Sequence, residues 1–122
     1  MISISKEPCP NKDSLTEYLN KHEKWLLELA NDYPGISKTV NTFGLKSIDT
    51  RSNDILYTFS WSFAVAEGWA FLYYADDGVL ENSGYTFTDD AYIDGLGING
   101  KGYIKCTRLK ENWFFVEGMI PT

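Results

Sequence analysis

The sequence predicts an α+β domain in which one N-terminal amphipathic helix packs on a mainly antiparallel sheet of five or six strands. Three observations lead to this prediction: a single stretch of helical periodicity near the N-terminus, a later series of short alternating apolar runs, and turn-forming residues between those runs. The 122 residues suffice for one such domain and are too few for two. We therefore assign residues 1–122 to a single domain.

The helix is predicted over residues 13–32, after an irregular polar arm at 1–12. Ser14-Leu15-Thr16-Glu17 has the pattern of a capping box, in which a serine and a glutamate three residues later satisfy backbone amides at a helix start. Proline disfavours helical geometry in the residue before it, so Tyr33-Pro34-Gly35 ends the pattern. Apolar and amphipathic residues recur in steps of three and four on one stripe: Leu15, Tyr18, Leu19, His22, Trp25, Leu26 and Leu29. The opposite face of the helix carries Lys21, Glu23, Lys24 and Glu28.

The sheet is predicted over residues 39–118. Within 55–65 every odd position is apolar, which predicts a strand with one apolar face that buries the helix stripe. Residues 69–75 are apolar on both faces, as expected of a central strand. In 39–48 the apolar residues change phase across Gly44, which indicates one strand with a bulge or at a sheet edge.

Shorter runs predict the rest of the sheet. Asp76-Asp77-Gly78 is a typical turn sequence, and residues 85–88 alternate again. Residues 89–100 are rich in aspartate and glycine and are predicted to form a loop. Residues 102–109 and 113–117 predict two strands joined by a short hairpin connection.

The charges are unevenly placed along the chain. Between Ser52 and Gly100 there is no lysine or arginine, while eight aspartates and glutamates lie in that segment. The remaining residues hold all eleven bases and the other nine acids. This pattern argues against nucleic acids and anionic membranes as partners, because both are bound by clustered lysine and arginine. It suits a basic protein partner.

No motif predicts an enzyme, a cofactor or a metal site. Gly95–Gly100 matches the letters of a dinucleotide fingerprint, but a strand is predicted after it where that fingerprint needs a helix. A calcium loop counted from Asp90 fails at two ligand positions. The single histidine, His22, and the thiols of Cys9 and Cys106 match no catalytic or metal spacing. Paired carboxylates of the glycosidase type stay open, since sequence spacing does not fix their distance.

Aromatic residues are in excess, with seven Phe, four Trp and eight Tyr. Exposed aromatic side chains among polar groups are typical of protein-binding surfaces, and nearby acids add orientation and association rate. The sequence therefore predicts a partner-binding surface made of acids and of tyrosines near turns. Its candidate residues are Asp76, Asp77, Glu81, Tyr85, Asp89, Asp90, Tyr92 and Asp94.

Residues 67–74 (EGWAFLYY) and 109–116 (LKENWFFV) share the character of a known class of proteins. In its size, acidity and aromatic content the chain resembles the immunity proteins of bacterial contact-dependent growth inhibition and related polymorphic toxin systems. The resemblance implies a cytoplasmic protein that binds a cognate basic toxin, often a nuclease, and blocks its activity. Those families share little sequence, so no functional residue is carried over by position.

Two other functions stay open. The first is a small-ligand module or weak enzyme, in which a curved sheet forms a cup lined by Trp61, Trp69, Tyr73 and Trp113. The second is a subunit that buries its aromatic residues in a homodimer. The sequence predicts neither the oligomeric state nor a role for either cysteine.

Overall fold

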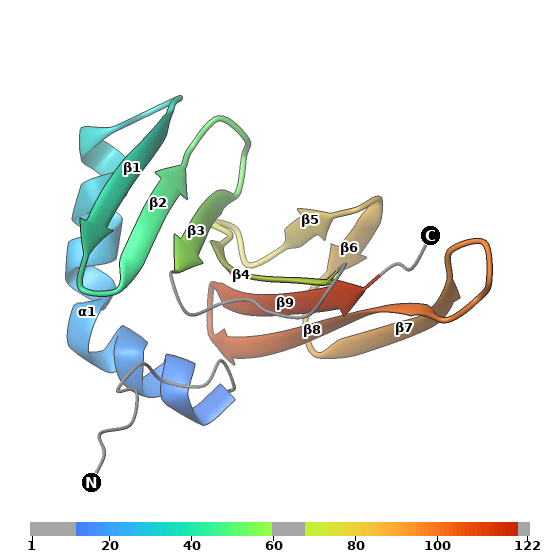
Figure 1. The fold of residues 1–122 in the computed structure, drawn as a ribbon. Coiled ribbons are helices and arrows are strands. Elements are labelled where there is room, and N and C mark those ends of the chain that lie inside the picture. Colours follow the sequence, from blue (N-terminus) through green and yellow to red (C-terminus); the bar gives the residue numbers. More distant parts are fainter. Residues whose placement is uncertain (1–11, 60–67, 120–122) are drawn as a thin grey trace, which may run out of the picture.

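In the computed structural model, which describes residues 12–59 and 68–119, the chain forms one helix and nine strands within those ranges (Figure 1). The helix α1 comes first and spans Lys12–Asp32. The strands follow in chain order as β1 (Ser37–Thr42), β2 (Leu45–Asp49), β3 (Ile55–Phe59), β4 (Gly68–Tyr74), β5 (Leu80–Asn82), β6 (Tyr85–Phe87), β7 (Ala91–Leu96), β8 (Gly102–Lys110) and β9 (Trp113–Met119).

Seven strands form one sheet in the order β1-β2-β3-β4-β9-β8-β7, with every neighbouring pair antiparallel. The short strands β5 and β6 form a separate antiparallel hairpin. One helix with an antiparallel sheet confirms the predicted α+β class. The predicted number of five or six strands is wrong. Three differences account for this: a strand divided in two, the short strand β5, and a strand in the expected Asp- and Gly-rich loop.

The divided strand is the predicted segment 39–48, which forms the hairpin of β1 and β2. Thr42 pairs with Leu45, so Phe43 and Gly44 form a two-residue turn, and both have positive φ angles, of 52° and 81°. Such turns match the right-handed twist of the strands but favour asparagine and glycine, which makes phenylalanine an unexpected first residue. The predicted sheet edge is confirmed, because β1 is terminal in the sheet. The change of phase across Gly44 comes from the turn and not from a bulge, and the register shift of β1 lies between Thr39 and Thr42.

The predicted loop at 89–100 contains strand β7, which pairs with β8 from Ala91 to Leu96. Aspartate and glycine are depleted in strands, and this made the segment look irregular. Gly95 has a φ angle of 78° at a register shift between Asp94 and Leu96, so the glycine permits a bulge within the strand. The remaining connection is a turn closed by the Gly100 N–H, which donates to the Gly97 carbonyl at 3.1 Å.

Helix α1 matches the predicted range closely, and it already includes Lys12 and Asp13. Ser14 therefore lies inside the first turn, and the predicted capping box at Ser14 is wrong. The buried stripe is narrower than predicted and consists of Leu15, Leu19, Leu26 and Ala30. The predicted stripe residues His22 and Trp25 are only half-buried. Within the described residues, no helix is long and apolar enough to cross a membrane.

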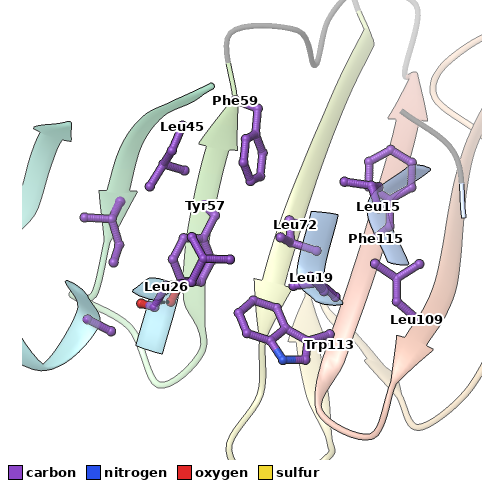
Figure 2. Close-up of a cluster of buried hydrophobic side chains, with 12 residues drawn as sticks. Leu15, Leu19, Leu26, Leu45, Tyr57, Phe59, Leu72, Leu109, Trp113 and Phe115 are labelled. Atoms are coloured by element: carbon purple, nitrogen blue, oxygen red, sulfur yellow. Dashed lines mark hydrogen bonds between the residues drawn. The ribbon is translucent and has the colours of Figure 1, made fainter. Parts of the chain in front are cut away.

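The stripe of α1 packs on one face of the sheet and forms the helix-side core (Figure 2). Its strand residues come from β2, β3, β4, β8 and β9, and they include Leu45, Ile48, Tyr57, Phe59, Leu72, Leu109, Trp113 and Phe115. Tyr57 and Phe59 confirm the predicted apolar odd face of β3; positions 60–65 of that prediction lie outside the described residues. The buried Tyr57 hydroxyl donates to the Leu26 carbonyl at 2.8 Å, which fixes the strand against the helix.

The opposite face of the sheet is covered in part by the β5–β6 hairpin, and this forms the hairpin-side core. Its buried residues are Ala75, Leu80, Phe87, Ile104, Cys106, Phe114 and Val116. Strand β4 lies at the centre of the sheet and contributes Leu72 to one core and Tyr73 to the edge of the other. The predicted central strand is therefore confirmed.

The sequence pattern predicts that Glu23 lies on a solvated face of the helix. In the structure its side chain instead contacts the β8–β9 hairpin. Its carboxylate accepts the Trp113 indole N–H at 2.9 Å and the Lys110 ammonium at 2.8 Å. The Lys110 hydrogen bond is the main reason that the pKa of Glu23 falls below its usual value, and the Trp113 bond adds to it, against a smaller opposing effect of burial. These bonds connect α1 to the β8–β9 hairpin.

Replacing Glu23 with Gln tests this connection. A lowered pKa means that ionised Glu23 stabilises the fold above its usual pKa of 4.5, and that this stabilisation is lost as the pH falls through the folded-state value. We expect E23Q to lower the free energy of unfolding by about 1 kcal/mol near neutral pH, with the difference from wild type shrinking in acid. Urea unfolding across pH measures this. The control E28Q changes an exposed glutamate of the same helix; a pH-independent loss in E23Q would contradict the account.

A second prediction concerns Gly118, which lies under the indole of Trp69 across the β4–β9 pair. A Cβ atom at Gly118 would lie 2.5 Å from Trp69 Cζ2, closer than van der Waals contact allows. We expect Gly118→Ala to cost about 1–3 kcal/mol of unfolding free energy. The same substitution in a Trp69→Ala background serves as the control and should cost much less. Equal losses in both backgrounds would show that the indole is not the cause.

Candidate functional site

The described surface has a cleft of about 640 Å³. The connection between β2 and β3, the connection between β4 and β5, and strand β5 surround it. Its lining contains no lysine or arginine. Five carboxylates line it, and together they define what we call the acidic cleft: Asp49, Asp54, Asp76, Asp77 and Glu81.

The β4–β5 connection is held in place by local hydrogen bonds. The Gly78 N–H donates to the Ala75 carbonyl at 2.9 Å, which closes the predicted turn. Within it, the Asp77 carboxylate accepts the Val79 N–H at 3.0 Å. The Asn112 side chain donates to the Asp76 carbonyl at 3.3 Å from the β8–β9 hairpin. These bonds fix the backbone of Asp76 and the carboxylate of Asp77 at the cleft, as expected where aspartates form turns.

Asp54 joins the two connections. Its Oδ2 accepts the Glu81 N–H at 3.0 Å and so links the β2–β3 connection to β5. Desolvation by burial is the largest effect on Asp54 and raises its pKa. The negative charges of Asp77 and Glu81 raise it further, while the Glu81 backbone bond opposes the shift. Burial first, and then repulsion by the neighbouring carboxylates, therefore favour the protonated form of Asp54.

Neutral polar groups also line the cleft. The Asn82 side-chain amide donates to the Tyr73 hydroxyl oxygen at 2.7 Å. Burial raises the pKa of Tyr73, and the nearby charge of Asp54 adds to that effect, so the phenol stays protonated at neutral pH. A ring edge, a hydroxyl and an amide thus accompany the carboxylates.

Arg51 is the basic residue nearest in sequence to the cleft residues, and it already forms an ion pair. Arg51 donates to both oxygens of Asp49, at 3.0 Å from Nε and at 2.7 Å from Nη2. The Arg51 side chain is the main reason that the pKa of Asp49 is lowered. Asp49 therefore contributes least to the free negative charge of the acidic cleft.

The structure brings together only some of the sequence-predicted site residues. Asp76, Asp77 and Glu81 line the acidic cleft. Tyr85 is half-buried at the edge of the hairpin-side core, next to Phe87. The other four do not line the cleft; they lie in β7 or just before it: Asp89, Asp90, Tyr92 and Asp94.

These four residues form a separate acidic surface, which we call the β7 edge. Asp90 Oδ1 accepts the Arg108 backbone N–H at 2.7 Å, and Asp89 accepts the Asp90 N–H at 2.8 Å. The Arg108 guanidinium is directed to the carbonyls of Thr88 and Glu111 instead of to a carboxylate. At the same edge, the ring of Tyr92 is 62% exposed and stacks on Tyr103 at 5.9 Å between centroids.

Sequence reasoning did not select Asp49, Asp54 or Asn82 as site residues, and it placed Tyr73 only in the alternative ligand cup. The one sequence signal for Asp54 is its position in the segment that lacks lysine and arginine. Its contact with Glu81 joins residues 27 positions apart, which depends on how β5 folds back over the sheet. Local sequence patterns do not report such a contact.

Other candidate chemistry is not assembled in the described residues. Within 12–59 and 68–119, no group of three or more His, Cys, Asp or Glu side chains could hold a metal ion. Cys106 is buried, and desolvation raises the pKa of its thiol to about 12, which favours the protonated thiol at neutral pH; Cys9 lies outside the described residues. The His22 ring packs against Tyr18 and Phe43, at 4.6 and 4.8 Å between centroids.

The four rings of the alternative ligand cup do not share one surface. Trp113 is buried in the helix-side core, while Trp69 and Tyr73 pack at the hairpin-side core on the opposite face. Trp61 lies outside the described residues. Of the three rings that the structure describes, only Tyr73 reaches the acidic cleft.

A scan against protein-family models gave no match, and searches of the curated proteins and of the solved structures found no significantly similar protein.

Replacing Asp54 with Asn tests the repulsion in the acidic cleft, because Asn keeps an oxygen for the Glu81 N–H. A raised pKa means that ionised Asp54 destabilises the fold at neutral pH, and that this cost disappears as the pH falls below its usual value of 3.8. We expect D54N to raise the free energy of unfolding by about 0.5 kcal/mol near neutral pH and to match wild type in strong acid. Urea unfolding measures both; a destabilised D54N would disprove the repulsion.

Proposed function

We propose that this protein binds and neutralises a basic protein toxin, and that cationic side chains of the toxin dock in the acidic cleft. The observation that carries the proposal is the cleft itself: a concave site of about 640 Å³ lined by five carboxylates, with no base among its lining residues. A concave site with charge of one sign focuses its field and speeds the encounter with a partner of opposite charge.

The chemistry of the cleft favours arginine and lysine side chains as its ligands. Carboxylates accept two parallel hydrogen bonds from a guanidinium, and charge-assisted bonds of this kind are stronger than neutral ones. Because Asp54, Asp77 and Glu81 repel one another, a bound cation also relieves a cost that the free protein carries. Binding is thus favoured both by attraction and by loss of repulsion.

A nuclease is the toxin class that fits this surface best. Proteins that bind nucleic acid do so through lysine and arginine that neutralise phosphates, so their substrate grooves are positively charged. A protein with an acidic cleft can occupy such a groove and exclude the substrate. The resemblance to immunity proteins supports this proposal. On this proposal the protein acts in the cytoplasm as an inhibitor and has no catalytic activity of its own.

A direct test uses hexa-arginine as the probe and hexa-citrulline, which is similar in shape but uncharged, as the control peptide. We expect hexa-arginine to shift the NMR resonances of residues 49–54 and 73–83, and citrulline to leave them unchanged. The triple variant D54N/D77N/E81Q should bind about tenfold more weakly or worse. The matched variant D13N/E17Q/D32N removes three exposed acids from α1 and should bind like wild type. Equal loss in both variants would show that only net charge matters and would contradict the proposal.

A growth assay tests the biological role. We expect the gene next to this one to encode a large secreted protein with a C-terminal toxin domain. Expressing that domain should arrest growth, and co-expressing this protein should restore it. The triple variant D54N/D77N/E81Q should protect less than D13N/E17Q/D32N. Growth arrest that wild-type protein does not relieve would overturn the proposed role.

A further inference from the structure

We propose that the free edge of β7 is a second docking element, which accepts an extended basic segment of the same partner as an added antiparallel strand. This inference rests on the proposed function only for the positive charge of the partner. The observation that supports the inference is the position of β7 at the end of the seven-stranded sheet, where it pairs with β8 alone among the described strands. Among the described residues, no strand lies along its other side.

The usable part of this edge is Ala91–Asp94. These residues pair with β8 in unbroken register, from Ala91 opposite Cys106 to Asp94 opposite Tyr103. In such a strand, half of the backbone N–H and C=O groups face away from the existing neighbour and can pair with an incoming strand. The bulge at Gly95 ends the regular edge, which limits the added pairing to a short segment.

The two faces of β7 set the pattern of side chains that an incoming strand needs. Ala91 and Ile93 are half-buried against the hairpin-side core. On the other face, Tyr92 and Asp94 are exposed. Directly opposed side chains in an antiparallel pair interact, so the incoming strand should alternate apolar and basic residues.

Charge distinguishes this edge from the other edge of the sheet. Strand β1 carries the exposed Lys38, and its register breaks next to Asn41, which has a φ angle of 56°. Lysine and bulges on an edge strand hinder the addition of another strand. Strand β7 has no base of its own and carries Asp94, with Asp90 directly before it. Lys105 of β8 is exposed opposite Tyr92, but Asp89, Asp90 and Asp94 outnumber it, so a basic segment is attracted to the β7 edge and repelled by Lys38 on β1.

The experiment uses a hairpin peptide of alternating lysine and valine, closed by an Asn-Gly turn, so that the strand is formed before it binds. The control peptide has the same sequence with N-methyl groups on alternate residues of the edge that meets the protein, which block the hydrogen bonds and keep the charge. NMR-detected amide exchange is measured on the full chain. We expect the parent peptide to slow exchange at alternate amides of residues 91–94 by about tenfold or more, and the methylated peptide to leave them unchanged.

A charge-reversed variant gives the second arm of the test. Asp94→Lys should abolish the protection at residues 91–94, while Lys105→Asp, on the exposed side of the neighbouring strand, should keep it. Protection by both peptides, or none by either, would overturn the strand-addition inference. Resonance shifts in the acidic cleft report separately on the proposed function: shifts there without protection at β7 refute only the inference, and protection at β7 without cleft binding refutes only the proposed function.

Discussion

The structure depends on the burial of both faces of the central strand pair β4–β9. Four successive residues of β9, Trp113 to Val116, are buried, and they point alternately to the two faces of the sheet. An element buried on both faces needs a covering layer on each side. Helix α1 covers one face, and the β5–β6 hairpin covers part of the other. To reach that face, the chain must turn over the end of β4, and this turn brings Asp76 and Asp77 beside the β2–β3 connection.

The acidic cleft thus forms where the chain turns to cover the second face of the sheet. The ionised form of Asp54 in this cleft destabilises the fold. Asp54 links the two connections through the Glu81 N–H, but burial and, to a smaller extent, the like charges of Asp77 and Glu81 disfavour its ionised form. Two other acids are paired: Glu23 is bound by Lys110 and Trp113, and Asp49, at the cleft itself, by Arg51. The remaining carboxylates of the cleft share one concave place with no base in its lining, which is a feature of a binding site for a cation.

Patterns that repeat along the chain could be predicted from the sequence. The helix at 13–32, the central strand β4 and the β8–β9 hairpin all follow from periodicity and turn chemistry. Strand β7 could not be predicted, because its aspartates and glycine are typical of loops and only pairing with β8 makes them a strand. The roles of Glu23 and Asp54 depend on contacts with residues far along the chain. For the same reason, the eight candidate site residues could not be divided between the acidic cleft and the β7 edge.

The pKa of the Asp54 carboxyl group, followed by ¹³C NMR in the free protein and with saturating hexa-arginine, tests the central claim most directly. Asp54 is one of the carboxylates of the acidic cleft, so its pKa responds to the charges around it. The account predicts a pKa above the usual 3.8 in the free protein and a clear fall when the peptide is bound, because a nearby cation favours the ionised form. A pKa that is the same with and without the peptide would show that cations do not dock beside Asp54, and the proposed binding site would be refuted.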